Sequence, residues 1–138
     1  ETMYSQSASV RLKMEAPRQM RMQNMDEVFP DGVLITIYDD IGTPKTTIKA
    51  DSAVYLDKVK TYTMVGNVLV RNEIQNQQLE TQTLNWDERL REIYTNDKVK
   101  ITTAKELIYG IGMRAKQDFS QYKIAKPTGT FSVEKENQ

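Results

Sequence analysis

Two successive segments of the chain share one pattern: residues 48–70 read IKADSAVYLDKVKTYTMVGNVLV, and residues 79–101 read LETQTLNWDERLREIYTNDKVKI. They align without a gap at an offset of 31 residues, and each contains a charged turn, at residues 56–60 and 87–91. The matched positions are Ile48 with Leu79, Ala50 with Thr81, Ala53 with Leu84, Tyr55 with Trp86, Tyr62 with Ile93, Val68 with Val99 and Val70 with Ile101. Self-similarity at a fixed period is typical of a supersecondary unit that is stacked on copies of itself.

The alternation of side chains predicts what this unit is. Residues of one parity share one face of an extended strand, and the apolar residues of segment 61–70 mostly have one parity: Tyr62, Met64, Val68 and Val70. The parity switches between Ala50 and Ala53 and again between Thr81 and Leu84, which predicts a bulge that bends the strand and keeps its apolar side chains on the same side. Each unit is therefore expected to be a long, bent β-hairpin.

The pattern extends in both directions along the chain. A looser third copy starts at Ile108, and a fragment of an earlier copy is found at Met14 and Ala16. The third copy includes Gly110, Met113, Tyr122 and Ile124 and ends on Phe131 and Val133, after an insertion around Pro127. Hairpins that each have one apolar face and bend at the same place curl into a two-walled trough when they stack. We predict an all-β fold, a bent antiparallel β-jellyroll in the form of a V-shaped stack of hairpins, with an apolar trough and two open edges.

The composition excludes several classes of function. Lysine plus arginine total 19 and aspartate plus glutamate total 19, so the chain has no net positive charge that would attract nucleic acid. We therefore expect that the protein does not bind nucleic acid. Cysteine and histidine are absent, which removes thiol nucleophiles, serine–histidine pairs and most transition-metal sites. We therefore predict neither a metal nor a cofactor.

The length of 138 residues predicts a single domain, with residues 1–9 and 134–138 as flexible ends. The longest largely apolar stretch, Val33 to Tyr38, is far shorter than the roughly 20 residues that a membrane-spanning helix needs. Because the sequence starts at Glu1 rather than methionine, we expect that a signal or membrane anchor has been removed from it.

Few residues are candidates for catalysis. The acidic pairs Asp39-Asp40 and Asp87-Glu88 could serve acid–base hydrolysis, but sequence neighbours seldom face each other and both pairs fall at predicted turns. Solvated turn residues are the favoured interpretation. No serine has a histidine to activate it or lies in a Gly-x-Ser-x-Gly turn, so a hydrolase is disfavoured.

Gly110-Ile111-Gly112 has the spacing that opens a nucleotide-binding loop, but the third glycine is missing and no helical pattern follows. The favoured interpretation is a backbone bend, in which Gly110 and Gly112 let a strand turn or another backbone come close.

Two groups of side chains leave alternatives open. Six aromatic residues are assigned to the inner face or its rim, where they fill a core that closes on itself or line a cavity for a long apolar ligand: Tyr55, Tyr62, Trp86, Phe119, Tyr122 and Phe131. A methionine-rich group among cations fits a lipid entrance, a docking edge or a plain core strand. Its members are Met14, Met20, Met22 and Met25 with Arg11, Lys13, Arg18 and Arg21.

Several short motifs, in their order and spacing, resemble those of the LptC family of lipopolysaccharide export proteins. They are Phe29-Pro30-Asp31-Gly32, Tyr38-Asp39 with Gly42, residues 50–55 (ADSAVY), Gly66-Asn67-Val68, Leu79-Glu80-Thr81, Trp86-Asp87, Ile93-Tyr94-Thr95, residues 99–103 (VKITT), Tyr109-Gly110-x-Gly112 and Gln117-Asp118-Phe119. The likeness runs from about Val10 to Val133. The related bridge protein LptA shares the repeat, so the superfamily is better defined than the member.

The resemblance implies a non-enzymatic transfer module in the periplasm, tied to the inner membrane through an N-terminal segment that this sequence lacks. Lipid A acyl chains of lipopolysaccharide would lie in the trough, the N-terminal edge would meet the inner-membrane export ABC transporter, and the C-terminal edge would pair with LptA. The residues expected to line the trough are Ile35, Ile48, Tyr55, Tyr62, Met64, Val68, Leu84, Trp86, Ile93, Val99, Ile101 and Phe119. Those expected at the partner edge are Tyr122, Ile124 and Phe131. The alternatives are a structural adaptor, or an LptA-like bridge acting through edge-strand pairing, and, well behind, an enzyme acting on surface glycans.

Overall fold

The computed structural model describes residues 2–7, 10–38, 43–117 and 119–132, and every regular element in these ranges is a β-strand. The strands are β1 (Thr2–Ser7), β2 (Val10–Glu15), β3 (Met20–Arg21), β4 (Glu27–Phe29), β5 (Val33–Tyr38), β6 (Pro44–Ala50), β7 (Ser52–Leu56), β8 (Thr61–Asn72), β9 (Gln77–Asp87), β10 (Glu92–Thr102), β11 (Glu106–Lys116) and β12 (Tyr122–Ser132). Within the described ranges there is accordingly no helix that could span a bilayer.

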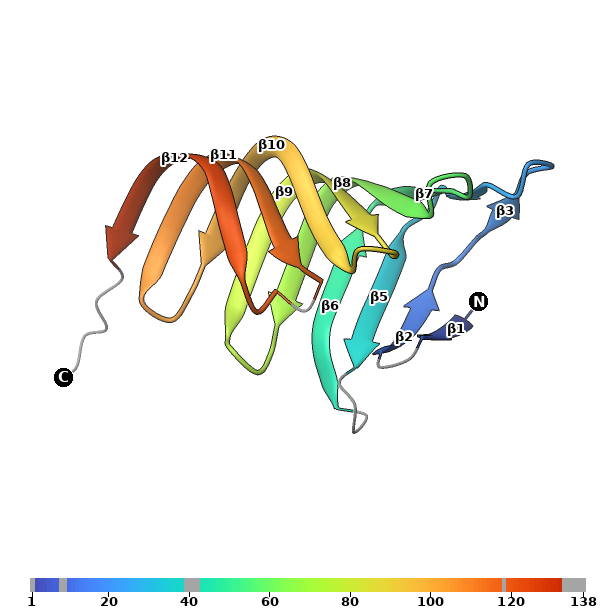
Figure 1. Cartoon of the computed structure of the whole chain (residues 1–138), viewed down its shortest axis with the longest axis horizontal. Helices are drawn as coiled ribbons and strands as arrows, with labels where there is room; N and C mark the ends of the chain where they lie inside the picture. Colours follow the sequence, from blue (N-terminus) through green and yellow to red (C-terminus); the bar gives the residue numbers. More distant parts are fainter. Residues whose placement is uncertain (1, 8–9, 39–42, 118, 133–138) are drawn as a thin grey trace.

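All strand pairs are antiparallel and belong to one sheet, with the order β1-β2-β5-β6-β8-β9-β10-β11-β12. The short strands β3, β4 and β7 continue this sheet beside β8, because β4 lies between β3 and β7, and β7 pairs with β8. Figure 1 shows the strands side by side along the long axis, from β1 and β3 at one end to β12 at the other.

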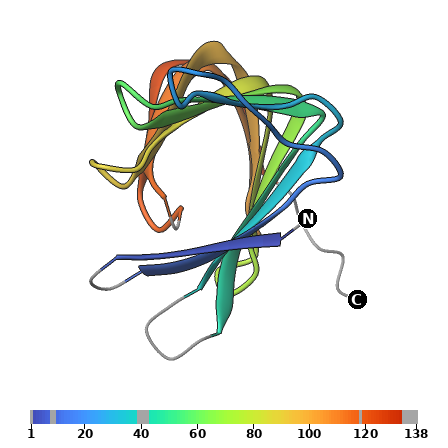
Figure 2. The same ribbon diagram turned by 90° about the vertical axis from the view of Figure 1, so that its right-hand side faces the viewer.

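The sheet folds over on itself into two walls. The first wall contains β1, β2, β5 and β6 with residues 68–72, 77–81, 99–102, 106–110 and 127–132 of the longer strands. The second wall contains β3, β4 and β7 with residues 61–65, 83–87, 92–95, 111–116 and 122–126. Seen from its N-terminal end, the sheet forms an open arc rather than a closed ring (Figure 2).

The walls meet at a corner where the strand register shifts. In the β8–β9 pair the shift lies between Val65 and Val68, opposite Thr83 and Thr81, so β8 carries one residue more than β9. Gly66 and Asn67 take left-handed conformations there, with φ of 91° and 46°. The neighbouring bend at Asp51 is tied to this bulge, because the backbone N–H of Asp51 donates to the Gly66 carbonyl at 2.9 Å and the side-chain Nδ2 of Asn67 donates to Oδ2 of Asp51 at 2.8 Å.

The repeat read from the sequence is confirmed by the register. One row of side chains runs across the inner face of the first wall, strand by strand: Met14, Ile35, Ile48, Val70, Leu79, Ile101 and Ile108. The bends predicted at residues 50–53 and 81–84 lie at the corner, but neither is a bulge in its own strand. At Asp51 the chain leaves β6 and enters β7, and at residues 81–83 the extra residue belongs to β8, at Gly66 and Asn67. The predicted fold class, a bent antiparallel sheet of hairpins with open edges, is therefore confirmed.

Two expectations differ from the structure. Residues 1–9 were expected to be a flexible end, but Thr2–Ser7 form β1, which pairs with β2 over six residues. The second difference concerns Phe131, which was assigned to the inner face or its rim. It lies opposite Leu107 on the outer face and is 57% exposed. The expected flexible segment 134–138 lies outside the described residues.

Candidate functional site

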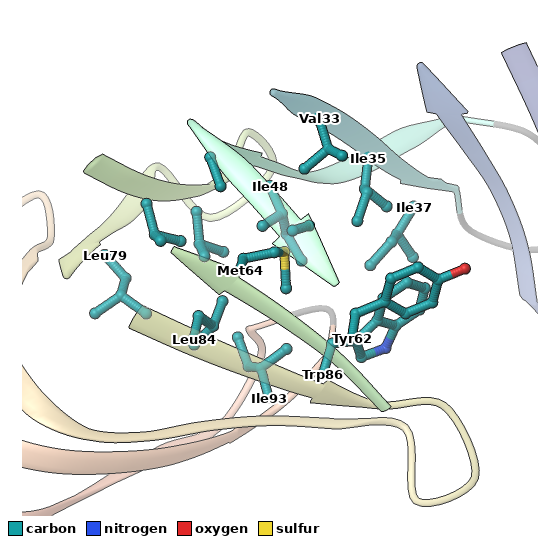
Figure 3. Close-up of a cluster of buried hydrophobic side chains, with 14 of the residues drawn as sticks. Val33, Ile35, Ile37, Ile48, Tyr62, Met64, Leu79, Leu84, Trp86 and Ile93 are labelled. Carbon is teal, nitrogen blue, oxygen red and sulfur yellow. The ribbon is translucent and has the colours of Figure 1, made fainter. Parts of the chain in front are cut away.

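The inner faces of the two walls form one apolar cluster that runs from β2 to β12. Figure 3 shows its middle part, from Val33 on β5 to Ile93 on β10. Of the side chains predicted to line a trough, the first wall supplies Ile35, Ile48, Val68, Val99 and Ile101, and the second wall supplies Tyr55, Tyr62, Met64, Leu84, Trp86 and Ile93. Strand alternation places them together because every second residue of a strand faces the same side. That they contact a lipid stays a prediction.

These side chains are shielded from solvent. Ile35, Ile48, Met64, Leu84 and Ile93 are each 0% exposed, although each belongs to a single-layered sheet. The inner face of such a sheet is exposed to solvent unless another part of the protein covers it, so the side chains of the facing wall must cover these residues. The interior is thus filled largely by the chain's own side chains. A ligand could enter it only if the two walls moved apart or if some of these side chains were displaced.

An aromatic ladder crosses the second wall near its open rim. The ring of Tyr62 lies 4.6 Å from that of Tyr55, 5.0 Å from that of Trp86 and 6.4 Å from that of Phe29. Strand register explains the ladder, since Tyr55, Tyr62 and Trp86 are directly opposite one another on β7, β8 and β9. Tyr55 alone of these four is only partly buried, so it is the member of the ladder nearest to solvent.

The connection between β11 and β12 carries a buried aromatic side chain into the interior. Phe119 is 0% exposed, stacks on Tyr122 at 5.3 Å and has φ of 59°, a left-handed conformation that is costly for a bulky residue. Just before it, the side-chain Oε1 of Gln117 accepts a buried hydrogen bond from the indole N–H of Trp86 at 2.9 Å, and the backbone N–H of Gln117 donates to the Arg91 carbonyl at 2.9 Å. These bonds fix the connection against the second wall.

Gly110 and Gly112 were predicted to permit a bend or a close approach, and each is found at such a place. A Cβ on Gly110 would overlap Cγ2 of Ile124 and would lie 3.0 Å from the Lys126 carbonyl oxygen. Gly112 has φ of 83°, and a Cβ there would lie 3.0 Å from that of Ala125. The two glycines therefore let β12 lie close against β11 at the corner.

The predicted partner edge is the last strand of the sheet. β12 pairs with β11 on one side only, and the described residues place no strand on its other side. Tyr122 and Ile124 are half-buried and pack against the inner cluster. Phe131 instead contacts Tyr109 on the outer face, with ring centroids 6.0 Å apart. Partner binding by these three residues stays a prediction.

The acidic pair at the end of β9 is a turn rather than a facing pair. Asp87 is 8% exposed, and its Oδ1 accepts hydrogen bonds from the Arg89 and Leu90 amides at 2.9 and 3.2 Å. Burial raises the pKa of the Glu88 carboxyl. The pair Asp39-Asp40 lies outside the described residues, and among those described there is no group of three or more carboxylates that could hold a metal ion.

The methionine-rich group divides into two parts. Met14 is a core residue at 2% exposure, whereas Met20, Met22 and Met25 are 39%, 40% and 51% exposed on the β3–β4 hairpin. The arginines between them are ion-paired, Arg18 with Asp31 at 3.0 Å and Arg21 with Glu27 at 3.1 Å. Lys13 pairs with Glu15, and the Arg11 side chain lies outside the described part. The cations are thus largely neutralised.

Some residues of the interior were missed from the sequence. Phe29, fully buried beside Tyr62, lies in a three-residue strand that is too short to show a period. Gln117 is polar and binds a residue 31 positions away, so no local pattern indicates it. Leu79 and Val70 were matched in the repeat and could have been added to the trough on that signal alone.

Two of the concave surfaces that the described residues form lie outside the interior. A cleft of about 530 Å³ at the corner is lined by residues 15–17, 31–34 and 49–51. A smaller pocket of about 180 Å³ lies at the rim of the second wall, lined by Glu92, Arg114, Ala115, Lys116, Gln121, Tyr122 and Lys123.

Comparison with known proteins identifies one family. The model of the family described as "Lipopolysaccharide-assembly, LptC-related" matches residues 1–128. Among solved structures, the chain is similar to LptH from Pseudomonas aeruginosa, described as the LptA-homologous periplasmic component of the conserved lipopolysaccharide transport device. The TM-score is 0.62 at 9% sequence identity, over 91% of this chain and 95% of that one, which is a likeness of fold. None of the curated protein sequences is significantly similar to the chain.

Proposed function

The chain belongs to the LptC-related family of lipopolysaccharide-assembly proteins and so has a role in lipopolysaccharide transport, and from this premise we propose that it is a non-enzymatic carrier of the lipid. In this proposal the acyl chains lie between the two walls while the sugars stay outside. The carrier accepts lipopolysaccharide from an inner-membrane export ABC transporter and passes it to a periplasmic bridge protein of the LptA kind.

The observation that carries the proposal is the continuity of the inner face. One apolar cluster reaches from Leu12 on β2 to Tyr122 and Ile124 on β12, so it extends to both ends of an open sheet. A core that serves stability alone does not need to reach both ends. An acyl chain gains about 0.8 kcal/mol for each methylene that leaves water, so several chains favour such an interior strongly.

The two ends of the sheet suit a series of carriers. An open edge can accept a further strand, with main-chain hydrogen bonds for affinity and alternate side chains for specificity. β12 would pair with the bridge protein, and the opposite end, at β1 and β3, would meet the transporter. Pairing of this kind aligns the inner faces of successive carriers, so the lipid can move without returning to water.

The proposed location is the periplasm, with attachment to the inner membrane through a segment ahead of Glu1. The similarity to LptH supports this location, because that protein is described as a periplasmic component of lipopolysaccharide transport. We propose no catalytic residue, since the carboxylate of Asp87 is engaged in its own turn.

Photo-crosslinking at adjacent positions tests the proposal. Tyr62 is 6% exposed on the inner face, and its neighbour Thr63 lies on the outer face, where its hydroxyl donates to Asn85 at 2.8 Å. A photo-reactive residue at Tyr62 should be labelled by lipopolysaccharide, and one at Thr63 should not. Tyr55, which is only partly buried, provides a second inner position, and its substitution should destabilise the fold less than substitution of the buried Tyr62. Equal labelling at inner and outer positions would refute a carrier.

The filled interior favours a second candidate, a structural adaptor that acts only through its edges. The fully buried side chains of both walls are the observation in its favour. The two candidates differ in one result: an adaptor pairs with its partner through β12 but is never labelled by lipid at Tyr62 or Tyr55.

A further inference from the structure

The concave surfaces outside the interior have opposite charge. The corner cleft is lined by the carboxylates of Glu15, Asp31 and Asp51 and by one cation, Lys49. The rim pocket, lined by residues 92, 114–116 and 121–123, has one carboxylate, Glu92, and three cations. Because the chain as a whole has no net charge, this difference is a local property of the rim.

The cations of the rim pocket lie close together because of strand register. Arg114 on β11 is directly opposite Lys123 on β12, and Lys116 follows Arg114 on the same face of β11. Side chains directly opposite in such a pair have Cβ atoms about 5 Å apart, and like charges in that position destabilise the sheet. Glu92 offsets part of this cost at Arg114, whereas none of the described carboxylates forms an ion pair with Lys123.

Two of the three cations remain available. Arg114 is held by Glu92, with 2.6 Å between Nη1 and Oε1, and its guanidinium lies 4.6 Å from the centre of the Tyr94 ring. Lys116 and Lys123 are exposed, and neither side chain forms an ion pair with any of the described residues. The pocket therefore presents two ammonium groups beside a fixed guanidinium.

The pocket is joined to the apolar interior by one side chain. Tyr122 lines the pocket, packs against the inner cluster and stacks on the fully buried Phe119. The three cations themselves lie on the outer face of the second wall, since Arg114 and Lys116 alternate with the buried Met113 and Ala115. A molecule with an apolar part between the walls therefore reaches this pocket only where its head group passes over the rim at Tyr122.

We propose that Lys116 and Lys123, with Arg114, bind a phosphate group on the head of the lipid whose acyl chains lie in the interior. The site rests on the proposed carrier function and specifies it, by naming the cations that take the head group. Phosphate suits the pocket because charge-assisted hydrogen bonds from several N–H donors to its oxygens are the stronger kind. The volume of about 180 Å³ is sufficient for one such group.

The test compares the double variant Lys116→Gln, Lys123→Gln with the control Lys58→Gln, Lys105→Gln. Both remove two exposed charges, and the control lysines lie in turns away from the pocket. The ligands are lipid A with its phosphates and the same lipid A after enzymatic removal of them, at a fixed detergent concentration. For phosphorylated lipid A we expect the Kd of the pocket variant to rise about fivefold, and that of the control by less than twofold, since exposed charge pairs are individually weak. Dephosphorylated lipid A should bind the three proteins alike.

The outcomes separate the site from the carrier function. If the pocket variant binds phosphorylated lipid A as wild type does, the site is refuted and the carrier stands. If wild type binds neither lipid, the carrier function fails. A third arm uses inorganic phosphate alone: if it binds at Lys116 and Lys123 while phosphorylation of the lipid changes no Kd, the pocket takes free phosphate and the assignment to a lipid head group is overturned.

Discussion

Substitution of Gly110 by alanine tests whether close contact between β11 and β12 holds the C-terminal edge in place. The added Cβ would overlap Cγ2 of Ile124 and would lie 3.0 Å from the Lys126 carbonyl and 3.4 Å from Cα of Pro127. Two of these three atoms are backbone and cannot rotate away. Overpacking of this kind costs about 1–3 kcal/mol, and at roughly 3–4 °C for each kcal/mol in a chain of this length we expect Tm to fall by about 3–12 °C.

A matched control exists on the same hairpin. At Gly129 the nearest atoms to an added Cβ are Cε2 and Cζ of Phe131, at 3.7 and 3.8 Å, which is ordinary contact. Neither Gly110 nor Gly129 has a positive φ, so alanine is compatible with the backbone at both. Gly129→Ala should therefore leave the free energy of unfolding within about 0.5 kcal/mol of wild type.

Urea unfolding of five proteins completes the measurement: wild type, the single variants Gly110→Ala, Gly129→Ala and Ile124→Ala, and the double variant Gly110→Ala, Ile124→Ala. Removing the Ile124 side chain relieves the first overlap but not the contact with the Lys126 carbonyl, so the double variant should recover part of the loss on Gly110→Ala relative to the Ile124→Ala background. If Gly110→Ala is as harmless as Gly129→Ala, the contact between the strands at the corner is not what limits the approach of β12.

Two further predictions concern polar side chains that directly follow strands of the second wall, Gln117 after β11 and Glu88 after β9. Gln117→Met keeps the bulk of the side chain but removes the acceptor of the Trp86 indole N–H, so we expect the free energy of unfolding in urea to fall by about 1–3 kcal/mol. The control Gln121→Met, at an exposed position of the same connection, should change this free energy little. Equal effects of the two substitutions would show that the indole finds another acceptor. Burial raises the pKa of Glu88 above its ordinary value of 4.5, so the folded state favours the protonated carboxyl. The stabilisation of the folded state by this group is therefore complete below pH 4.5 and is lost as the pH rises through the folded-state pKa. Glu88→Gln, which resembles the protonated form, should therefore be more stable than wild type at pH 7 and equal to it near pH 4; parallel stability curves between these pH values would contradict the assignment.

The sequence predicted the parts of the fold that depend on side-chain period. Ile48, Val70, Leu79 and Ile101 could be aligned because a strand repeats every two residues and the hairpin repeats every 31. The face of the sheet on which Phe131 lies could not be predicted, because the register of β12 shifts between Gly129 and Pro127 and a shift of one residue exchanges the two faces. The strand at Thr2–Ser7 was missed because its polar sequence has no apolar alternation, and it is defined by its partner β2.

Of the candidate site, the sequence predicted which side chains come together but not whether they leave room for a guest. Parity assigns Ile35, Met64 and Leu84 to one face, yet their complete burial depends on how closely the opposite wall approaches, which no local pattern encodes. Phe119 was assigned to the trough on the motif that surrounds it. Its placement depends on a left-handed backbone and on the bond between Gln117 and Trp86.

The filled interior has a consequence for how a carrier of this kind can release its lipid. An acyl chain that enters between the walls gains about 0.8 kcal/mol per methylene relative to water, but it replaces contacts that the buried side chains already make with each other. When the acyl chain comes from a neighbouring carrier, it is already out of water. The free-energy change of its transfer is then close to zero, because similar apolar contacts are lost in one carrier and gained in the other. In the proposed function, a closed resting interior would keep the affinity low enough for onward transfer. The direction of movement would then be set by the transporter that loads the first carrier rather than by any gradient of affinity within this chain.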